Sequence, residues 1–502
     1  MPVSFRLYNT LTRTTEAFVP LVPGQIGLYV CGMTVYDEAH VGHARAMMVF
    51  DTFVRWLRSS GWKVVFVRNF TDVDDKIITR ATERGEEPAV LAQQYVDAFH
   101  RDADALGLLR PTHEPRVTKS IPAIVAMITT LVERGHAYQA DGSVWFAVDS
   151  CPTYGELSGQ KPGELRSADV GGKRSPADFA LWKGTKPGEP AWESPWGPGR
   201  PGWHIECSAM VKGILGDTID IHGGGLDLVF PHHENEVAQS ECANGEPGGK
   251  GARPFARYWM HNGLLTMASG QKMGKSLGNV VNIKDLLTHF PAESLRLYYL
   301  QNHYRSPLPW NEDALPTALA MLARLYDARE QAESLGGSDE PVDRLVRELG
   351  NEAKDVVDIA AAFNDRFDNA LANDFNTAEA LGIAFELARA MNRFAHLKPA
   401  KKRGAPIARL AIQAIERLSS LGLLEQSTQQ FQDDVKQKRL TALGLTANEI
   451  EGRLAERRTA RDTKDWARAD AIRIELDGKG IVVMDRPDGV DWRVKLEVAA
   501  AG

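Results

Sequence analysis

The chain has 502 residues, which is enough for about three to four domains of typical size. Apolar residues make up 43% and charged residues 25%, which excludes wholesale disorder, and a net charge of −7 argues against wrapping nucleic acid through overall charge. The cysteines (Cys31, Cys151, Cys207 and Cys242) lie far apart, and no apolar run approaches the roughly 18 residues that span a bilayer, so we expect a soluble cytoplasmic protein without a disulfide framework.

The first elements of the chain predict a strand–helix–strand unit. Apolar runs at 26–30 and 64–67 flank a helical period over 46–57. Both runs are typical of parallel strands that are buried on two faces, as in an α/β nucleotide-binding fold of the Rossmann type. A second such unit follows, with a strand at 218–221, a tight turn at 222–225 and a helix from Leu226 onward. The α/β domain is therefore predicted to be split.

An insertion separates the two halves, with a helix at 121–134 and a loop rich in Pro, Gly and Trp at 183–202. Helical spacing of apolar residues downstream predicts an α-helical bundle, followed by a small C-terminal α+β module. The expected units are the α/β domain at 1–120 and 201–250, the insertion at 121–200, a connecting region at 251–318, the bundle at 319–430 and the C-terminal module at 431–502.

Two short motifs favour a phosphate ligand. His40, Gly42 and His43 stand before the first helix, where imidazoles and a helix N-terminus suit a phosphate. Lys272 and Lys275 lie in a Gly-rich loop and could hold a triphosphate and its leaving pyrophosphate. Each motif alone also fits an ordinary helix start or a solvated turn.

A metal site is a further hypothesis. His232 and Glu236 are four residues apart at the start of a predicted helix, so they face the same way, and Cys31 and Cys207 each lie beside a proposed active-site segment. Two thiols, an imidazole and a carboxylate form a plausible zinc set. The spacing alone leaves an alternative open, in which the cysteines are small buried apolar residues and His232 pairs with Glu236.

Taken together, the motifs resemble those of the cysteinyl-tRNA synthetases, which are class I aminoacyl-tRNA synthetases. The resemblance covers nearly the whole chain and rests on the two phosphate motifs and on segments 29–37, 69–76, 178–183, 202–208, 220–225 and 230–236. One departure is visible, because Gly274 stands in the lysine loop where the family usually carries Ser. Glycine widens the backbone freedom of that loop.

The resemblance implies that ATP activates cysteine to cysteinyl-adenylate, releasing pyrophosphate, and that cysteine then passes to the 3′-terminal ribose of tRNA(Cys). It implies Mg²⁺ with the ATP and one zinc ion per chain, which would bind the thiolate of cysteine and so distinguish it from serine. The implied site residues are His40, His43, Lys272 and Lys275 for catalysis; Gly42, Lys275, Asp227 and Trp203 for ATP; Gly32, Thr71 and His222 for the amino acid; and Cys31, Cys207, His232 and Glu236 for zinc.

The C-terminal module carries a basic stretch, since residues 436–468 contain nine basic and five acidic side chains. Such a run is often a solvated helix face, yet Trp466 among arginines also suits a base stacked on an aromatic ring. The module resembles the family's anticodon-binding domain, which implies that Arg461, Asp470 and Asp485 read base edges and that Trp466 stacks. We expect a monomer.

Two rival interpretations remain. A related enzyme could ligate cysteine to an amino sugar, as mycothiol ligases do, but those relatives lack an anticodon-binding domain, and residues 431–493 of this chain resemble one. A catalytically inactive RNA-binding regulator would have the same parts, but it would not be expected to keep both histidines, both lysines and all four zinc candidates.

Overall fold

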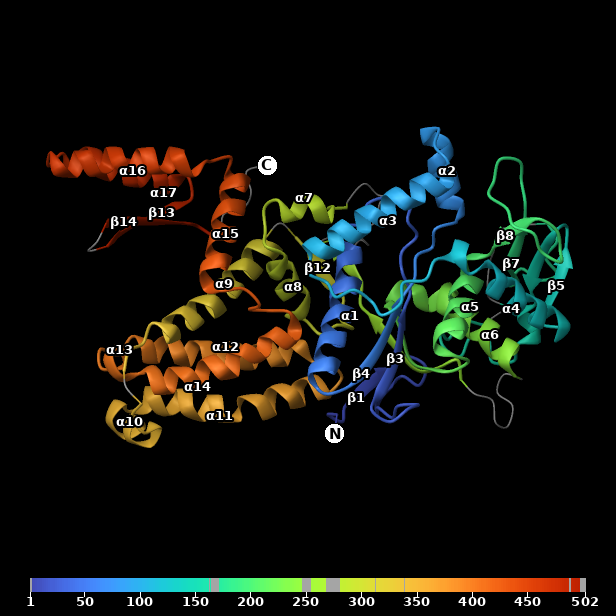
Figure 1. The fold of residues 1–502 in the computed structure, drawn as a ribbon, viewed down its shortest axis with the longest axis horizontal. Coiled ribbons are helices and arrows are strands. Elements are labelled where there is room, and N and C mark those ends of the chain that lie inside the picture. The colour runs from blue at the N-terminus through green and yellow to red at the C-terminus, as the bar shows by residue number, and fades with distance from the viewer. Residues whose placement is uncertain are drawn as a thin grey trace.

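A computed structural model describes residues 2–161, 163, 171–245, 254–267, 280–311, 313–337, 339–486 and 489–496. Figure 1 shows a parallel sheet near the centre of an elongated molecule, with a smaller strand-containing unit on one side and a bundle of helices on the other. The last part of the chain forms a separate unit beyond the bundle. Within the described ranges, no helix combines the length and apolar composition needed to cross a membrane.

The central sheet has four parallel strands in the order β10–β9–β3–β4. They are β3 (Gln25–Val30), β4 (Lys63–Arg68), β9 (Ile219–Gly225) and β10 (Ala256–Asn262). The chain passes from β3 to its neighbour on one side and from β9 to its neighbour on the other, so the strand order reverses between β3 and β9. Ligands of such sheets bind beside this reversal, at the carboxyl ends of the strands. The predicted split Rossmann-type sheet is confirmed.

The predicted tight turn at 222–225 is wrong, because β9 continues as a strand to Gly225 and pairs with β10 up to Asn262. The glycines are needed for close packing instead. A Cβ atom on Gly223 would lie 2.4 Å from the ring of Phe50, and one on Gly224 would lie 2.8 Å from the ring of His233. Glycine here lets a helix and a histidine approach the strand.

Helices cover both faces of the sheet. Ile26 and Leu28 of β3 pack in the core that includes helix α1 (Val41–Ser59), whereas Tyr29 faces the core that includes α5 (Trp203–Leu215) and α6 (Glu234–Asn244). As expected, the chain runs from Leu226 into a helix: a 3-10 turn at Leu226–Leu228 and a π-helical stretch at Val229–His233, kinked at Phe230, lead into α6. Helices α2 (Asp75–Arg84) and α3 (Pro88–Ala105) follow β4, and strands β1 (Arg6–Asn9) and β2 (Thr14–Ala17) form an antiparallel pair near the start of the chain.

The insertion contains α4 (Ile121–Glu133) and an antiparallel sheet in the order β5–β6–β7–β8. Its strands are β5 (Ala137–Ala140), β6 (Ser143–Phe146), β7 (Phe179–Gly184) and β8 (Gly199–Pro201). The segment predicted as a loop, 183–202, is therefore strand at both ends, because Lys183 pairs with Arg200 and the neighbouring Trp182 is fully buried.

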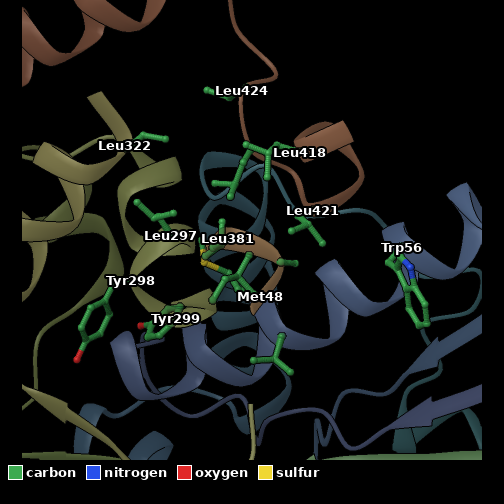
Figure 2. Close-up of a cluster of buried hydrophobic side chains, with 14 of the residues drawn as sticks. Met48, Trp56, Leu297, Tyr298, Tyr299, Leu322, Leu381, Leu418, Leu421 and Leu424 are labelled. Atoms are coloured by element: carbon green, nitrogen blue, oxygen red, sulfur yellow. The ribbon is translucent and has the colours of Figure 1, made fainter. Parts of the chain in front are cut away.

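A short parallel strand pair, β11 (Leu265–Met267) with β12 (Leu308–Trp310), follows the central sheet, together with α7 (Ile283–Leu287) and α8 (Ala292–Leu300). The predicted bundle comprises α9 (Ala314–Glu333), α10 (Val342–Leu349), α11 (Asn351–Ala372), α12 (Thr377–Ala395), α13 (Ala400–Arg403) and α14 (Ala405–Ile415). Figure 2 shows that Met48 of α1, Leu297 of α8 and Leu381 of α12 belong to one buried cluster. The bundle and one face of the sheet therefore share a hydrophobic core.

The C-terminal unit has a small core of its own. It consists of α15 (Thr428–Leu443), α16 (Ala447–Asp462), α17 (Trp466–Gly478) and the antiparallel pair β13 (Ile481–Arg486) and β14 (Gly489–Val494). Leu440, Ile472 and Trp492 lie in this core, apart from the large cluster. Helices α9 and α15 each begin shortly before the expected domain boundaries at 319 and 431.

Candidate active site

The predicted ligands meet where the strand order reverses. Cys31 follows β3 directly, and His222 lies on the neighbouring β9, in register with Tyr29. Helices α5 and α6 bring Cys207 and Glu236 to the same end of the sheet. Segments from distant parts of the sequence thus converge on the edge at which doubly wound sheets bind ligands.

The four predicted metal ligands, Cys31, Cys207, His232 and Glu236, form one cluster in which all donor atoms lie within 4.8 Å of one another. The two Sγ atoms are 3.8 Å apart, and Cys31 Sγ lies 3.3 Å from Glu236 Oε1. His232 Nε2 lies 3.6 Å from Cys207 Sγ and 2.9 Å from Glu236 Oε1. Cys31 is half-buried and the other three residues are buried.

These separations fit a tetrahedral zinc site. With bonds of about 2.3 Å to sulfur and about 2.0 Å to nitrogen, a tetrahedron has edges of about 3.8 Å between two sulfurs and about 3.5 Å between sulfur and nitrogen. The corresponding separations here are 3.8 and 3.6 Å. An overlapping group replaces Cys207 and His232 with His222 and His233 and offers only one sulfur. The two-thiol group is therefore the better match for a borderline-soft ion.

Further histidine contacts orient these ligands. His222 Nε2 lies 2.9 Å from Glu236 Oε2, the carboxylate oxygen that does not face His232. His204 Nδ1 lies 2.9 Å from His232 Nδ1, on the ring edge opposite the cluster. Contacts of this kind fix the tautomer and ring orientation of metal ligands.

Charges within the cluster shift the pKa values. Burial alone would raise the pKa of Glu236, but the adjacent His222 and His232 lower it to about 2. Although burial opposes it, the Glu236 carboxylate raises the pKa of His232 to about 10. The hydrogen bond from Cys31 lowers the pKa of Cys207 to about 6, whereas burial raises that of Cys31. The cluster therefore favours negative charge on Glu236 and Cys207, which suits a cation, whereas His232 would have to release its proton before it could bind a metal.

The start of α1 presents two ordered imidazoles. His40 Nδ1 accepts from the Gly42 N–H at 3.0 Å, and His43 Nδ1 accepts from the His40 N–H at 3.3 Å. In the neutral rings the proton must then be on Nε2, which makes each Nε2 a donor suited to a phosphate oxygen. A Cβ atom on Gly42 would lie 2.8 Å from the His40 ring, so this capping arrangement requires glycine.

Lys272, Lys275 and Gly274 lie outside the described residues. The backbone that follows them is joined to the start of α1, because Val41 N–H donates to Val281 O at 2.9 Å and Ile283 N–H donates to Ala39 O at 3.3 Å. The segment after the lysine loop and the histidine motif therefore have a fixed relative position.

Among the predicted amino-acid and nucleotide residues, Gly32, Thr71 and Trp203 lie beside ligands of the metal cluster or their sequence neighbours. A Cβ atom on Gly32 would lie 1.6 Å from Asn69 O, so this backbone contact excludes any side chain. Thr71 follows β4, and its hydroxyl donates to Glu206 at 3.1 Å. Trp203 is 36% exposed and stacks on His232 with ring centroids 4.3 Å apart. Asp227 lies in the 3-10 turn after β9.

Sequence reasoning missed Glu206, His204 and the buried pair of His233 and His261. His233 Nδ1 lies 2.8 Å from His261 Nε2, whose ring also contacts Thr10. Burial, Cys207 and Asp74 raise the pKa of Glu206. The position of Glu206 among the apolar residues of α5 could have indicated a special role from sequence alone. The histidine contacts join distant segments, so no local sequence pattern indicated them.

The predicted anticodon residues lie on α16, α17 and β13. Asp485 accepts two hydrogen bonds from Arg457, at 2.8 and 2.9 Å, and one from Arg461 at 2.6 Å. These arginines, Arg457 foremost, lower the pKa of Asp485 to about 2. Trp466 is 58% exposed, and Asp470 lies on the same helix. Arg457 was not predicted to have a role here.

Three family models match this chain. A class I (C) tRNA synthetase catalytic domain matches residues 17–320, a DALR domain matches 366–425, and a cysteinyl-tRNA ligase anticodon-binding domain matches 439–493. The cysteine–tRNA ligase of Geobacter metallireducens is 47% identical over 98% of this chain and 100% of its own length. That of Alkalilimnicola ehrlichii is 48% identical over 97% of this chain and 99% of its own.

Solved structures share the fold at low sequence identity. A methionyl-tRNA synthetase of Mycobacterium tuberculosis has a TM-score of 0.59 and 15% identity, covering 85% of this chain and 95% of its own. The structure of a putative arginyl-tRNA synthetase from Campylobacter jejuni has a TM-score of 0.54 and 13% identity, covering 80% of this chain and 93% of its own. These likenesses concern the fold alone.

Proposed function

The chain belongs to the cysteine–tRNA ligases, a family of class I aminoacyl-tRNA synthetases, and from that premise we propose how its residues activate cysteine and charge tRNA(Cys). The observation that carries the proposal is the convergence of two thiols, an imidazole and a carboxylate at the point where the strand order reverses.

Selection of cysteine begins at the metal cluster. Cys31, Cys207, His232 and Glu236 would hold one zinc ion, with His222 and His204 orienting the ligands. When bound, zinc supplies a borderline-soft Lewis acid that attracts a thiolate and leaves a serine hydroxyl a weak ligand. An apolar pocket alone would separate such near-isosteres by only about 1 to 3 kcal/mol. Gly32 and Thr71 would contact the rest of the amino acid, and Trp203 would close the pocket over His232.

Adenylation requires ATP at the adjacent start of α1. The Nε2–H groups of His40 and His43 would donate to phosphate oxygens, and Gly42 would allow close approach of the backbone. Lys272 and Lys275 would stabilise the leaving pyrophosphate, and Asp227 would bind the adenosine ribose. Mg²⁺ would accompany the nucleotide. The carboxylate of cysteine attacks the α-phosphorus, so the protein contributes positioning and charge stabilisation rather than a nucleophile.

Transfer then places cysteine on the tRNA. The terminal ribose hydroxyl attacks the carbonyl carbon of the adenylate, forming an ester and releasing AMP. Arg461, Asp470 and Asp485 would read anticodon bases and Trp466 would stack on one of them. The Asp485 carboxylate would exchange its contacts with Arg457 and Arg461 for contacts with RNA.

We also propose how the chain is divided into domains and where it acts. The catalytic domain comprises 1–120 and 201–250, with a connective insertion at 121–200 and a stem-contact region at 251–318. The bundle and the anticodon-binding domain start with α9 and α15, close to the expected residues 319 and 431. The protein acts as a monomer in the cytoplasm.

Metal analysis combined with X-ray absorption at the zinc edge tests the central claim. We expect one zinc ion per chain, with two sulfur neighbours without substrate and three in the presence of cysteine, while serine leaves the spectrum unchanged. An unchanged sulfur count with cysteine would refute recognition through the metal. Charging of total tRNA with labelled cysteine tests the reaction, and formation of a cysteine–amino-sugar conjugate without charging would favour the rival ligase.

A further inference from the structure

Glu206 is a buried acid whose side chain has one hydrogen-bond partner among the residues that the structure describes. Its side chain is 1% exposed, it lies on α5 directly before Cys207, and its Oε2 atom accepts from the Thr71 hydroxyl at 3.1 Å. Thr71 belongs to the segment after β4, which lies next to the segment that carries Cys31 and Gly32, since Thr71 bridges to Thr34. The Glu206–Thr71 pair thus lies next to the segment that carries Cys31 and Gly32.

No cation within the described ranges forms an ion pair with Glu206. Its strongest electrostatic neighbours are themselves acidic or thiol groups: Cys207, Asp74 and Asp72. Glu206 lies in the first turn of α5, where the helix dipole favours an acid only weakly, and in the part of the chain that the structure describes no side chain caps this helix. Burying an ionised acid with one hydroxyl donor and no counter-charge is costly, which is why burial and these neighbours raise the pKa of Glu206 while the described residues place no positive group nearby. A positive group supplied by a ligand would remove that cost.

The substrate brings such a group. Free cysteine carries an α-ammonium group two carbon atoms from its sulfur, and the sulfur is expected at the metal cluster beside Cys207. A hydroxyl that donates its proton to Glu206 keeps its lone pairs for an incoming N–H donor. Thr71 therefore has the polarity required to accept from an ammonium group, and Glu206 sets that polarity.

We propose that Glu206 is a positioning residue which, through the Thr71 hydroxyl and its own negative charge, fixes the α-ammonium group of the amino-acid substrate. The inference rests on the proposed function, because it takes the Cys31–Cys207 cluster as the place where the thiol binds. Glu206 and Thr71 would thus select ligands a second time, because a ligand whose thiol binds the cluster would also need a free ammonium group.

The test compares two ligands that differ only in the ammonium group: cysteine and 3-mercaptopropionate. The variant Glu206→Gln keeps the size and an oxygen that can accept from Thr71 but removes the charge. We expect the KM for cysteine in pyrophosphate exchange to rise about 10- to 100-fold, as for loss of a charged hydrogen bond. The inhibition constant of 3-mercaptopropionate should stay within about threefold of the original value, and zinc content should not change.

Equal weakening of both ligands, or no weakening of either, would overturn the inference, because a structural role has no reason to depend on the ammonium group. Thr71→Val offers an independent variant that should give the same ligand-selective pattern should Glu206→Gln fold poorly. Glu293→Gln is the matched control, since Glu293 is also buried and accepts from a hydroxyl, that of Tyr326 at 2.6 Å, in the α8–α9 region. It should leave both constants unchanged.

The two levels of proposal fail in different ways. Absence of cysteine-dependent exchange in the unaltered protein would contradict the proposed function itself. Normal exchange combined with an unchanged preference for cysteine over 3-mercaptopropionate in Glu206→Gln would contradict only the role of Glu206.

Discussion

The metal cluster and the anticodon-binding surface handle polar groups in opposite ways. Around the cluster, Glu236 is fully buried and both of its carboxylate oxygens are held by histidines at 2.9 Å. On the C-terminal unit, Trp466 is 58% exposed and the side chain of Asp485 is 48% exposed, paired with arginines at the surface. The cluster would bind a small substrate with side chains whose positions are already fixed. The C-terminal surface would bind RNA with exposed side chains that can exchange one hydrogen-bond partner for another.

This difference predicts unequal sensitivity to substitution. Buried polar networks in a low-dielectric interior are costly to leave partly satisfied. Exposed ion pairs contribute only about 0 to 1 kcal/mol each. Changes at the cluster should therefore abolish the first reaction step, and changes at the C-terminal surface should affect tRNA while leaving that step intact.

The largest effect is expected for Cys207→Ser. Loss of one thiolate should reduce bound zinc below one per chain and lower kcat/KM for cysteine in pyrophosphate exchange by more than about a hundredfold. ATP binding, measured by equilibrium dialysis, should change little because the start of α1 is untouched. Unaltered affinity for cysteine in this variant would contradict the role given to the metal.

A smaller effect should follow from His222→Phe. The phenyl ring can keep the stacking of His222 on Trp259, at 4.5 Å between centroids, but it cannot contact Glu236. Loss of such an outer contact typically costs about 10- to 100-fold in metal affinity. Competition with a chelator measures this affinity. Zinc affinity equal to that of the unaltered protein would mean that Glu236 needs no orientation by His222.

Trp466→Ala tests the anticodon-binding surface of the C-terminal unit. Removal of a stacking ring should weaken tRNA binding by about 1 to 3 kcal/mol per stacked base, seen as a higher KM for tRNA in charging. Pyrophosphate exchange without tRNA should remain unchanged. A loss of exchange would show that the two regions are not independent.

The smallest effect is expected for Asp485→Asn, measured as the free energy of unfolding of the C-terminal unit. Since Arg457 lowers the pKa of Asp485 to about 2, the ionised carboxylate stabilises the fold above its ordinary pKa of about 4. The stabilisation should be under about 1 kcal/mol because the Asp485 carboxylate is 48% exposed, although the side chain of Arg457 is only 6% exposed. The difference between variant and original should shrink as pH falls from about 4 to 2. A pH-independent difference would point to packing instead.

Local sequence patterns predicted many of the elements. The apolar runs around Ile26 and Val64 predicted parallel strands, and the spacing of His232 and Glu236 predicted their common direction. Spacing alone left the metal hypothesis open for Cys31 and Cys207, which are 176 residues apart, and the resemblance to a known family favoured them as ligands.

The remaining features depend on contacts between distant segments. Residues 222–225 looked like a turn because glycine is common in turns, but the rings of Phe50 and His233 require glycine within a strand. Glu206 went unnoticed because its importance lies in its contact with Thr71, which is 135 residues away. The orientation of His40 likewise follows from a hydrogen bond that its spacing does not specify.

The shared core between α1 and the bundle limits where the polypeptide can be divided. Met48, Leu297 and Leu381 bury one another across three helices (Figure 2), so a fragment ending before α9 would leave a leucine-rich surface open to water and would aggregate when expressed. Phe431 and Val435 of α15 belong to the same cluster, and Phe431 stacks on Tyr326 of α9, so this part of α15 is needed to keep the cluster covered. A shortened enzyme that still adenylates cysteine should therefore be obtained by cutting within α15 after Val435, and not by isolating the nucleotide-binding half.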